Sequence, residues 1–382
     1  MKKVLVIAGE ASGDLHASNL VRATASRDPS IAFFGVGSSR MRDAGVRMLA
    51  DASEISVVGI TEVATHAGAI FRVYGKLRKF LRDERPDLLV LIDFPDFNIL
   101  VGKAARRLGI PIVYYISPQV WAWRRGRIRT IAGLVRTMMV VFPFEERLYR
   151  DAGVDVRFVG HPLTDVVRSS FTVEDARKRF GLDPGRRTVA VLPGSRRSEV
   201  AGLLPAMLDA AGSLHARFSD LQFILPVAPT LPEEHIRTLC AQAKAPVTVT
   251  SGSVYDVLRA SDAAIVASGT ATLETALMNV PMVIVYRVSR LTALLVRMLA
   301  TYDHVGLPNI VAGRRIVPEL LQEAVTGANI DAALVPLLED RQARDAALRG
   351  LAEVRRKLGE EGASARAAAV VLEQLGIQGG TV

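Results

Sequence analysis

The sequence predicts an α/β protein with two doubly wound domains, and three observations support this. Short runs of β-branched and apolar residues alternate with helical patterns along the chain, which indicates βαβ units on parallel sheets. The chain has 382 residues, enough for two domains of ordinary size. Hydrophobic residues make up 49% of it, which is enough to fill two cores and excludes a disordered protein.

The strand and helix patterns place the elements in order. Strands are predicted in the first half at residues 4–8, 32–36, 88–93, 112–116, 137–142 and 156–159. In the second half they are predicted at 188–192, 221–226, 247–250, 263–267 and 282–286. Residues 177–187 are charged and rich in turn formers, the composition of a linker. Residues after Pro318 predict helices, so we expect domains at 1–170 and 171–345, and C-terminal helices at 346–382 that cap the sheets or cross back to the first domain.

Cysteine, histidine and hydropathy patterns narrow the class of protein. Cys240 is the only cysteine, so no internal disulfide or zinc cluster is expected and the compartment should be reducing. The six histidines lack metal-ligand spacing, so we expect neither a metal nor a cofactor. The apolar run at 4–8 is too short for a signal peptide, and no run reaches the ~18 residues of a membrane span. We therefore expect a cytoplasmic protein whose membrane contact, if any, is peripheral.

The basic residues are concentrated in the first half of a chain with a formal net charge of +9. Residues 97–144 contain eight Lys and Arg and no acid, a pattern that attracts phosphates, anionic lipid or nucleic acid. The alternative is a set of ordinary solvated helix faces.

An amphipathic segment at residues 63–82 is also free of acids. It combines basic residues with apolar ones near helical spacing, namely Val63, Ile70, Phe71, Tyr74 and Leu77. This favours an interfacial helix that contacts a membrane or acyl chains. The alternative is a surface helix packed on the sheet. Residues 291–299 form a weaker candidate of the same kind.

In parallel sheets, ligands bind beyond the carboxyl ends of strands, so the residues that follow each strand are informative. In the first half these include Glu10, then Asp93 and Asp96. A carboxylate with apolar walls behind it holds its proton more tightly and can act as a general base for a hydroxyl. The alternative is that both aspartates form the turn around Pro95, with Asp96 or Asn98 capping a helix.

The second half carries two turns suited to an anion. Ser195 and Arg196 follow a strand, and the guanidinium of an arginine there can form bidentate hydrogen bonds with phosphate oxygens. The second turn leads into a helix whose positive end and free N–H groups suit a diphosphate, and its residues are Ser268, Gly269, Thr270, Ala271 and Thr272. Glu274 is placed to accept a pair of sugar hydroxyls, or alternatively is an ordinary first-turn acid behind an N-cap. A dinucleotide-binding Gly-x-Gly-x-x-Gly after the first strand is absent.

The ordered set of these motifs resembles the lipid-A-disaccharide synthase family, inverting glycosyltransferases of Gram-negative bacteria. The matching stretches are residues 8–14, 92–98, 117–123, 142–145, 159–162, 192–196 with Glu199, 267–274, 307–309 and 319–322. The resemblance implies the GT-B fold, two Rossmann-like domains with an active site in the interdomain cleft. It also implies the reaction of UDP-2,3-diacylglucosamine with 2,3-diacylglucosamine 1-phosphate (lipid X) to the β-1,6-linked disaccharide 1-phosphate and UDP.

The resemblance also assigns residues and partners. Asp93 is implied as the base for the acceptor 6-hydroxyl. Glu10, Arg196 and Asn309 match other functionally important family positions and are implied as further catalytic residues. The turn at 268–274 matches the nucleotide-diphosphate site. The implied partners are the two substrates and the anionic cytoplasmic face of the inner membrane, without nucleic acid, and a homodimer remains open.

Two other functions are kept as alternatives. Another UDP-sugar enzyme of this fold, an epimerase or a peptidoglycan glycosyltransferase, would explain the diphosphate turn but not the apolar basic segment. A nucleic-acid-binding protein could use the arginines of 124–136 and stack bases on Trp121 and Trp123. It would leave the polar turns after the strands unexplained.

Overall fold

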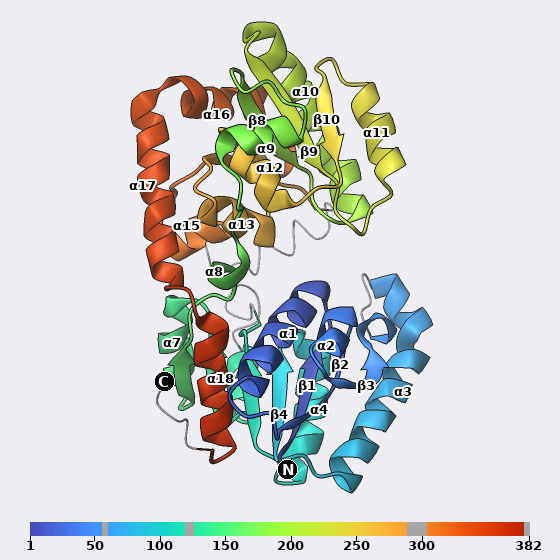
Figure 1. Cartoon of the computed structure of the whole chain (residues 1–382). Helices are drawn as coiled ribbons and strands as arrows, with labels where there is room; N and C mark the ends of the chain where they lie inside the picture. Colours follow the sequence, from blue (N-terminus) through green and yellow to red (C-terminus); the bar gives the residue numbers. More distant parts are fainter. Residues whose placement is uncertain (56–59, 119–125, 289–303, 378–382) are drawn as a thin grey trace. The chain divides into compact units, whose positions relative to one another are not determined.

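The computed structural model describes residues 1–55, 60–118, 126–288 and 304–377, in two compact units (Figure 1). Unit 1 is Met1–Asp165 with Leu358–Val382, and unit 2 is Val166–Lys357. The predicted linker at 177–187 is wrong, because it lies inside unit 2. Arg177 is buried there, and its guanidinium donates to the Ala260 carbonyl at 3.0 Å and to Asp262 at 2.6 Å. One charged residue of this stretch, Arg177, thus forms a partly buried ion pair inside the unit.

Unit 1 contains a seven-stranded parallel sheet. Its strand order is β3 (Arg47–Asp51), β2 (Ala32–Gly37), β1 (Lys3–Ala8), β4 (Leu88–Ile92), β5 (Ile112–Tyr115), β6 (Thr137–Val140) and β7 (Asp155–Phe158). The sequence analysis missed β3, an edge strand with a single buried residue. The chain runs from β1 outward to β3 and then returns to place β4 on the other side of β1. The ends of β1 and β4 are therefore the topological switch point, where ligands bind in such sheets.

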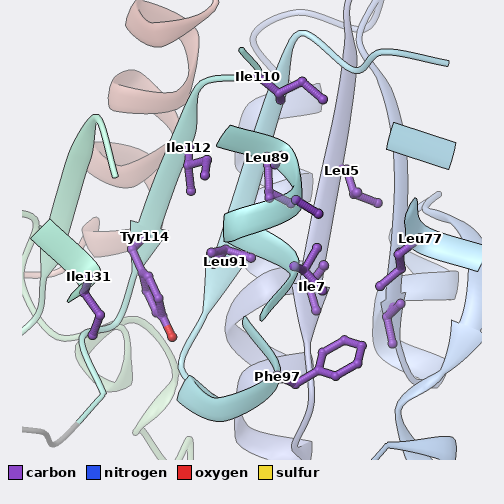
Figure 2. Close-up of a cluster of buried hydrophobic side chains, with 14 of the residues drawn as sticks. Leu5, Ile7, Leu77, Leu89, Leu91, Phe97, Ile110, Ile112, Tyr114 and Ile131 are labelled. Atoms are coloured by element: carbon purple, nitrogen blue, oxygen red, sulfur yellow. The ribbon is translucent and has the colours of Figure 1, made fainter. Parts of the chain in front are cut away.

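Helices cover both faces of the unit 1 sheet. They are α1 (Ala11–Ala25), α2 (Ser39–Asp43), α3 (Ile60–Asp83), α4 (Pro95–Arg107), α6 (Gly126–Ala132), α7 (Pro143–Arg150) and α18 (Ala363–Gln374), with a 3₁₀ turn at Ala52–Glu54. The short helix α8 (Leu163–Val166) lies where the chain passes from unit 1 to unit 2. On one face, side chains of β1, β4 and β5 pack against α3, α4 and α6, as Figure 2 shows. This apolar cluster is the core of unit 1.

The C-terminal helix α18 returns to unit 1 and lies against α1 (Figure 1). The Asp165 carboxylate accepts hydrogen bonds from the backbone N–H groups of Gly362, Ala363 and Ser364 at the start of this helix, at 2.7 to 3.1 Å. A negative charge is favourable at a helix N-terminus. Arg366 of α18 also donates to the carbonyl of Val159 at 2.8 Å, directly after β7. The side chains of Asp165 and Arg366 therefore hold α18 against the segment that follows β7.

Unit 2 contains a six-stranded parallel sheet. Its order is β10 (Val247–Thr250), β9 (Leu221–Pro226), β8 (Arg187–Leu192), β11 (Ala263–Ala267), β12 (Met282–Tyr286) and β13 (Glu319–Leu321). β13 was not predicted, because a strand of three residues that begins with a glutamate is too short to show a strand pattern. The switch point of this sheet lies between β8 and β11. Both of the turns that the sequence singled out for an anion begin there.

The helices of unit 2 pack on both sides of this sheet. They are α9 (Val173–Arg179), α10 (Arg197–Arg217), α11 (Glu233–Ala241), α12 (Val254–Ala260), α13 (Thr270–Leu277), α15 (Leu307–Ala312), α16 (Gly327–Glu339) and α17 (Arg341–Leu358), with a 3₁₀ turn at Gln322–Ala324. α10 packs against α16, α9 against α12 and α13 against α15. In the described part of the chain, no helix combines the length and the apolar character needed to cross a membrane.

Candidate functional site

The switch point of unit 1 brings two predicted site carboxylates together. Ala8 pairs with Ile92 in register, so the turns that carry Glu10 and Asp93 begin side by side. Glu10 is exposed and Asp93 is partly buried. Burial, and then the negative charge of Glu10, raise the pKa of Asp93 to about 6. At neutral pH this group is ionised yet holds a proton more tightly than an ordinary aspartate, which suits a general base.

The backbone that carries Asp93 is strained. Asp93 and Phe94 have φ angles of 43° and 46°, in the left-handed region. This region costs roughly 1–2 kcal/mol for a residue other than glycine. The Phe94 ring lies so close to Gly9 that a Cβ atom on Gly9 would be 2.4 Å from it, so only glycine fits there. Strain of this kind persists where the surroundings enforce it, and it clusters at functional sites.

The alternative assignment of Asp96 and Asn98 as helix caps is wrong. The residue before α4 is Phe94, and no side chain caps this helix. The Asp96 side chain is 77% exposed and pairs with Arg127. The buried Asn98 side chain instead donates to the carbonyls of Ile92 at 3.1 Å and Asp93 at 2.7 Å. Asp93 is therefore the aspartate of this motif that combines partial burial with a place at the switch point.

Other polar residues that follow the strands of unit 1 have structural roles. Asp14 accepts hydrogen bonds from the N–H groups of Ser38, Arg40 and Met41 at the start of α2, at 2.6 to 3.3 Å. His16 and His161 are buried with their rings edge to face, 6.4 Å apart. Burial lowers the pKa of His16 to about 4 and that of His161 to about 3, so both are neutral at pH 7. We regard the two histidines as packing residues.

At the switch point of unit 2, the turn with Ser195 and Arg196 is held by hydrogen bonds to Glu199. The Glu199 carboxylate accepts hydrogen bonds from the N–H groups of Ser195 at 3.0 Å and Arg196 at 3.2 Å. It also pairs with the Arg196 guanidinium at 2.8 Å, while the Arg196 side chain stays 55% exposed. Gly194 has a φ of 107°, and a Cβ atom there would lie 2.4 Å from Glu199. Glu199 thus fixes the turn and presents Arg196 at the rim of the sheet.

The second anion turn lies next to the first, because Val266 of β11 pairs with Leu192 of β8. Gly269 has a φ of 151°, and α13 begins at the next residue, Thr270. The first N–H groups of a helix have no partner within it, so those of Thr270 and Ala271 are suited to an anion. Thr272 is buried and its hydroxyl donates to the Gly269 carbonyl at 2.7 Å. Its role is therefore to shape the turn.

Two tyrosines at this end of the sheet were missed by the sequence analysis. Tyr255 of α12 donates its hydroxyl hydrogen bond to Glu274 at 3.0 Å, and burial raises the pKa of that carboxyl. Tyr286 is the last residue of β12; burial raises its pKa, and the charges of Glu199 and Arg196 also act on it. The rule about residues at strand ends could have found Tyr286. Tyr255 had no signal, because its contact arises from the packing of separate helices.

Asn309 occupies a buried network next to the second turn. Its amide nitrogen donates to the Val317 carbonyl at 3.0 Å and to Glu319 at 2.6 Å. Its amide oxygen accepts from the N–H groups of Ile316 at 2.8 Å and Val317 at 3.1 Å. Glu319 in turn accepts from the N–H groups of residues 305 and 306, and the hydroxyl of Ser268 donates to the carbonyl of residue 305. Asn309 therefore supports the turn at Ser268 from inside the protein.

The predicted membrane helix is α3, and the structure corrects part of its predicted contact surface. Leu77 is completely buried in the core, so its assignment to a membrane contact is wrong. Ile70 and Tyr74 are half-buried against the same core. Phe71 lies off this apolar stripe and is 69% exposed. An apolar stripe at helical spacing fits a sheet as well as a membrane, and here most of it packs on the sheet.

Several predicted features fall outside the described residues. These are the side chain of Val63, Trp121 and Trp123, and residues 291–299. Within the described ranges, no group of three His, Cys, Asp or Glu side chains is arranged to hold a metal ion.

The chain has two α/β units, each a parallel sheet covered by helices, and this is the architecture of the GT-B fold. The UDP-GlcNAc 2-epimerase from Neisseria meningitidis bound to UDP-GlcNAc shares it with a TM-score of 0.62 and 13% identity, covering 98% of this chain and 99% of that one. The glycosyltransferase of kitacinnamycin shares it with a TM-score of 0.63 and 17% identity, over 98% and 99% of the two chains. The predicted fold class is confirmed. At such identities the likeness concerns the fold alone.

The sequence then fixes the family. Residues 4–373 match the profile of the lipid-A-disaccharide synthetase family. The lipid-A-disaccharide synthase of Geobacter sulfurreducens is 52% identical over 376 residues, which cover 98% of each chain. The chain belongs to this family of glycosyltransferases. The predicted family and enzyme class are confirmed, and the alternatives of an epimerase, a peptidoglycan glycosyltransferase and a nucleic-acid-binding protein are not supported.

Proposed function

We propose that this protein transfers the diacylglucosamine unit of UDP-2,3-diacylglucosamine to the 6-hydroxyl of 2,3-diacylglucosamine 1-phosphate. The products are the β-1,6-linked disaccharide 1-phosphate and UDP. The family match supports these substrates, and one structural observation carries the chemistry. This observation is the carboxylate of Asp93, with its raised pKa, at the switch point of the unit 1 sheet.

In the proposed mechanism Asp93 takes the proton of the acceptor hydroxyl as its oxygen attacks the anomeric carbon of the donor. The bond between that carbon and the diphosphate breaks on the opposite side, which inverts the configuration. Burial keeps the pKa of Asp93 high, and Glu10 adds to this because two carboxylates near each other disfavour a second negative charge. Proton abstraction and bond formation are thereby joined in one displacement.

The residues of unit 2 would stabilise the leaving UDP. The start of α13 offers N–H groups and the positive end of a helix. The Arg196 guanidinium, which pairs with Glu199 in the free protein, can instead bind a phosphate oxygen of UDP. Such donors lower the barrier when they are in place before charge develops. Glu274, held by Tyr255, is proposed to accept the ribose hydroxyls.

Release of UDP measures the proposed reaction directly. The purified protein should release UDP from the diacylated donor when the diacylated acceptor is present. A non-acylated glucosamine 1-phosphate acceptor should support much slower release. Equal release with either acceptor would contradict the proposed substrate class, and no release with the acylated pair would contradict the proposed function.

We predict that Arg196→Ala and Glu274→Ala each weaken UDP binding by about 10- to 100-fold, because a charge-assisted hydrogen bond contributes roughly 1.5–3 kcal/mol. Calorimetric titration with UDP measures this. Arg197→Ala is the matched control, since this neighbouring arginine is also exposed but has no role in the proposed site. Wild-type affinity in both test variants would remove the anion turns from the UDP site.

We also propose that α3 contacts the anionic cytoplasmic face of the inner membrane. Phe71 projects from the helix, and the exposed basic residues on its side of the helix, seven and eleven residues further on, are Arg78 and Arg82. Helix α4, which packs against α3, exposes Leu100 and Lys103 as well. An apolar side chain within a basic surface combines burial in the lipid interface with attraction to anionic headgroups.

Phe71→Ser should reduce sedimentation with vesicles that contain phosphatidylglycerol, by roughly 10-fold if burial of the ring contributes 1.5 kcal/mol or more. UDP affinity and melting temperature should stay at wild-type values, because the ring packs on nothing in the core. Val173→Ser, at a residue that is 41% exposed on α9, controls for the loss of an exposed apolar side chain. Binding should also weaken with salt. Full sedimentation of the folded Phe71 variant would rule out this surface as the anchor.

A further inference from the structure

The carbonyl oxygen of Asp93 has two side-chain donors, both from inside unit 1. The Asn98 amide donates to it at 2.7 Å and the Tyr114 hydroxyl at 2.6 Å. The N–H group of Asp93 still bonds to the Tyr115 carbonyl at 3.3 Å, as an extension of the β4–β5 pairing. The strand pairing thus ends at Asp93, and side chains take over the hydrogen bonding of the strained turn.

The Tyr114 hydroxyl is unusual for its surroundings. Tyr114 is 1% exposed and its ring lies in the apolar core with Ile112, Leu91 and Ile131 (Figure 2). A phenylalanine would fill that space equally well, and a buried hydroxyl is costly unless it has a partner. This hydroxyl donates its hydrogen bond to the Asp93 carbonyl. The ring of Tyr114 therefore serves the core, while its hydroxyl serves the turn at Asp93.

We propose that Tyr114 is a positioning residue that, with Asn98, clamps the Asp93 carbonyl and so holds the left-handed turn in which the Asp93 carboxylate lies beside Glu10. This inference rests on the proposed role of Asp93 as the base. The positive φ angles of Asp93 and Phe94 raise the free energy of the turn, so without the clamp the turn relaxes toward ordinary backbone angles. The carboxylate then moves from its place and gains water.

The neighbouring residue supplies a matched control. Tyr115 is 0% exposed, stands on the opposite face of β5, and its hydroxyl has no hydrogen-bond partner among the described residues. Tyr114→Phe and Tyr115→Phe remove the same atom from equally buried rings. The two variants differ in the bond to Asp93. Asn98→Ala, which removes the other donor, is the second test variant.

The experiment compares kcat, the KM for the UDP-sugar and the pH dependence of kcat/KM in these variants. Tyr114→Phe should lower kcat by about 10- to 100-fold, since small displacements of a reacting group have effects of this size. The KM for the UDP-sugar should not change. The acidic limb of the profile, near pH 6 in the wild type, should move to lower pH because the carboxyl becomes more hydrated. Asn98→Ala should shift the limb in the same direction.

If Tyr114 only stabilised the fold, Tyr114→Phe would lower the melting temperature without moving the acidic limb of the kcat/KM profile. Tyr115→Phe should keep both the wild-type kcat and the wild-type limb. If Tyr114→Phe and Asn98→Ala also keep them, the clamp is refuted. Asp93→Asn separates the two proposals: if it is inactive while Tyr114→Phe matches Tyr115→Phe, only the clamp is wrong, whereas normal turnover in Asp93→Asn refutes the base itself.

Discussion

Asp93→Asn should lower turnover by about 10² to 10⁴-fold, the usual contribution of a positioned general base. In the wild type, kcat/KM should rise with pH through about 6, because the active form is the carboxylate and burial with Glu10 raises its pKa to that value. The variant should lack this limb. UDP affinity should be unchanged, since the proposed UDP-binding residues all lie in unit 2.

Asp96→Asn is the matched control for this result. Asp96 lies three residues along the same motif, but its side chain is 77% exposed and pairs with Arg127. Its turnover and pH profile should match the wild type. Near-normal turnover in Asp93→Asn, or an equal loss in Asp96→Asn, would remove Asp93 from the mechanism.

Asp93→Asn should also be more stable than the wild type at neutral pH. The pKa of Asp93 is raised from 3.8 to about 6, so the folded protein binds this proton more tightly than the unfolded chain does. The ionised group therefore destabilises the fold by up to about 3 kcal/mol above pH 6, and the effect disappears as the pH falls toward 4. Thermal unfolding should show a higher melting temperature for Asp93→Asn at pH 7.5 and a smaller difference at pH 4.5.

Much of the fold and the place of the site could be predicted because both depend on local patterns. The central strands are buried on both faces and appear as apolar runs, and the residues after them lie at the sheet ends whatever the helices do. Glu10, Asp93, Arg196 and Ser268 were found in this way. The edge strands β3 and β13 were missed because they are short and mostly half-exposed, and each begins with a charged residue.

The remaining errors come from contacts between distant segments. The stripe that includes Leu77 is apolar whether it faces a sheet or a membrane, so only the packed structure shows which side chain projects. The same holds for Tyr114 and Tyr255, whose hydroxyls meet partners on other elements. Sequence spacing predicts which face a residue occupies, but a hydrogen bond across a core requires the packing that brings the partners together.

Asn309 received a predicted catalytic role from the family resemblance, and the structure leads us to propose that it acts through the turn it supports. Its amide uses both donor positions and both acceptor positions on residues 316–319, inside a buried network. A group occupied in this way does not need to touch the substrate to matter. Its loss would leave the N–H groups of Ile316 and Val317 and the Val317 carbonyl without these partners, and would remove one of the donors to Glu319.

Asn309→Ala should therefore lower the free energy of unfolding by about 2–4 kcal/mol, because unsatisfied buried polar groups cost roughly 1–3 kcal/mol each and the site can partly relax. UDP affinity should fall in parallel, since Ser268 loses the support that reaches it through Glu319 and the turn at residues 305 and 306. Denaturant unfolding and UDP titration of the same sample measure both effects. Asn329→Ala, at an exposed asparagine of α16 that donates to the Ala324 carbonyl, should change neither by a comparable amount. A direct catalytic role predicts the opposite result for Asn309→Ala: wild-type stability and UDP affinity with a large loss of turnover.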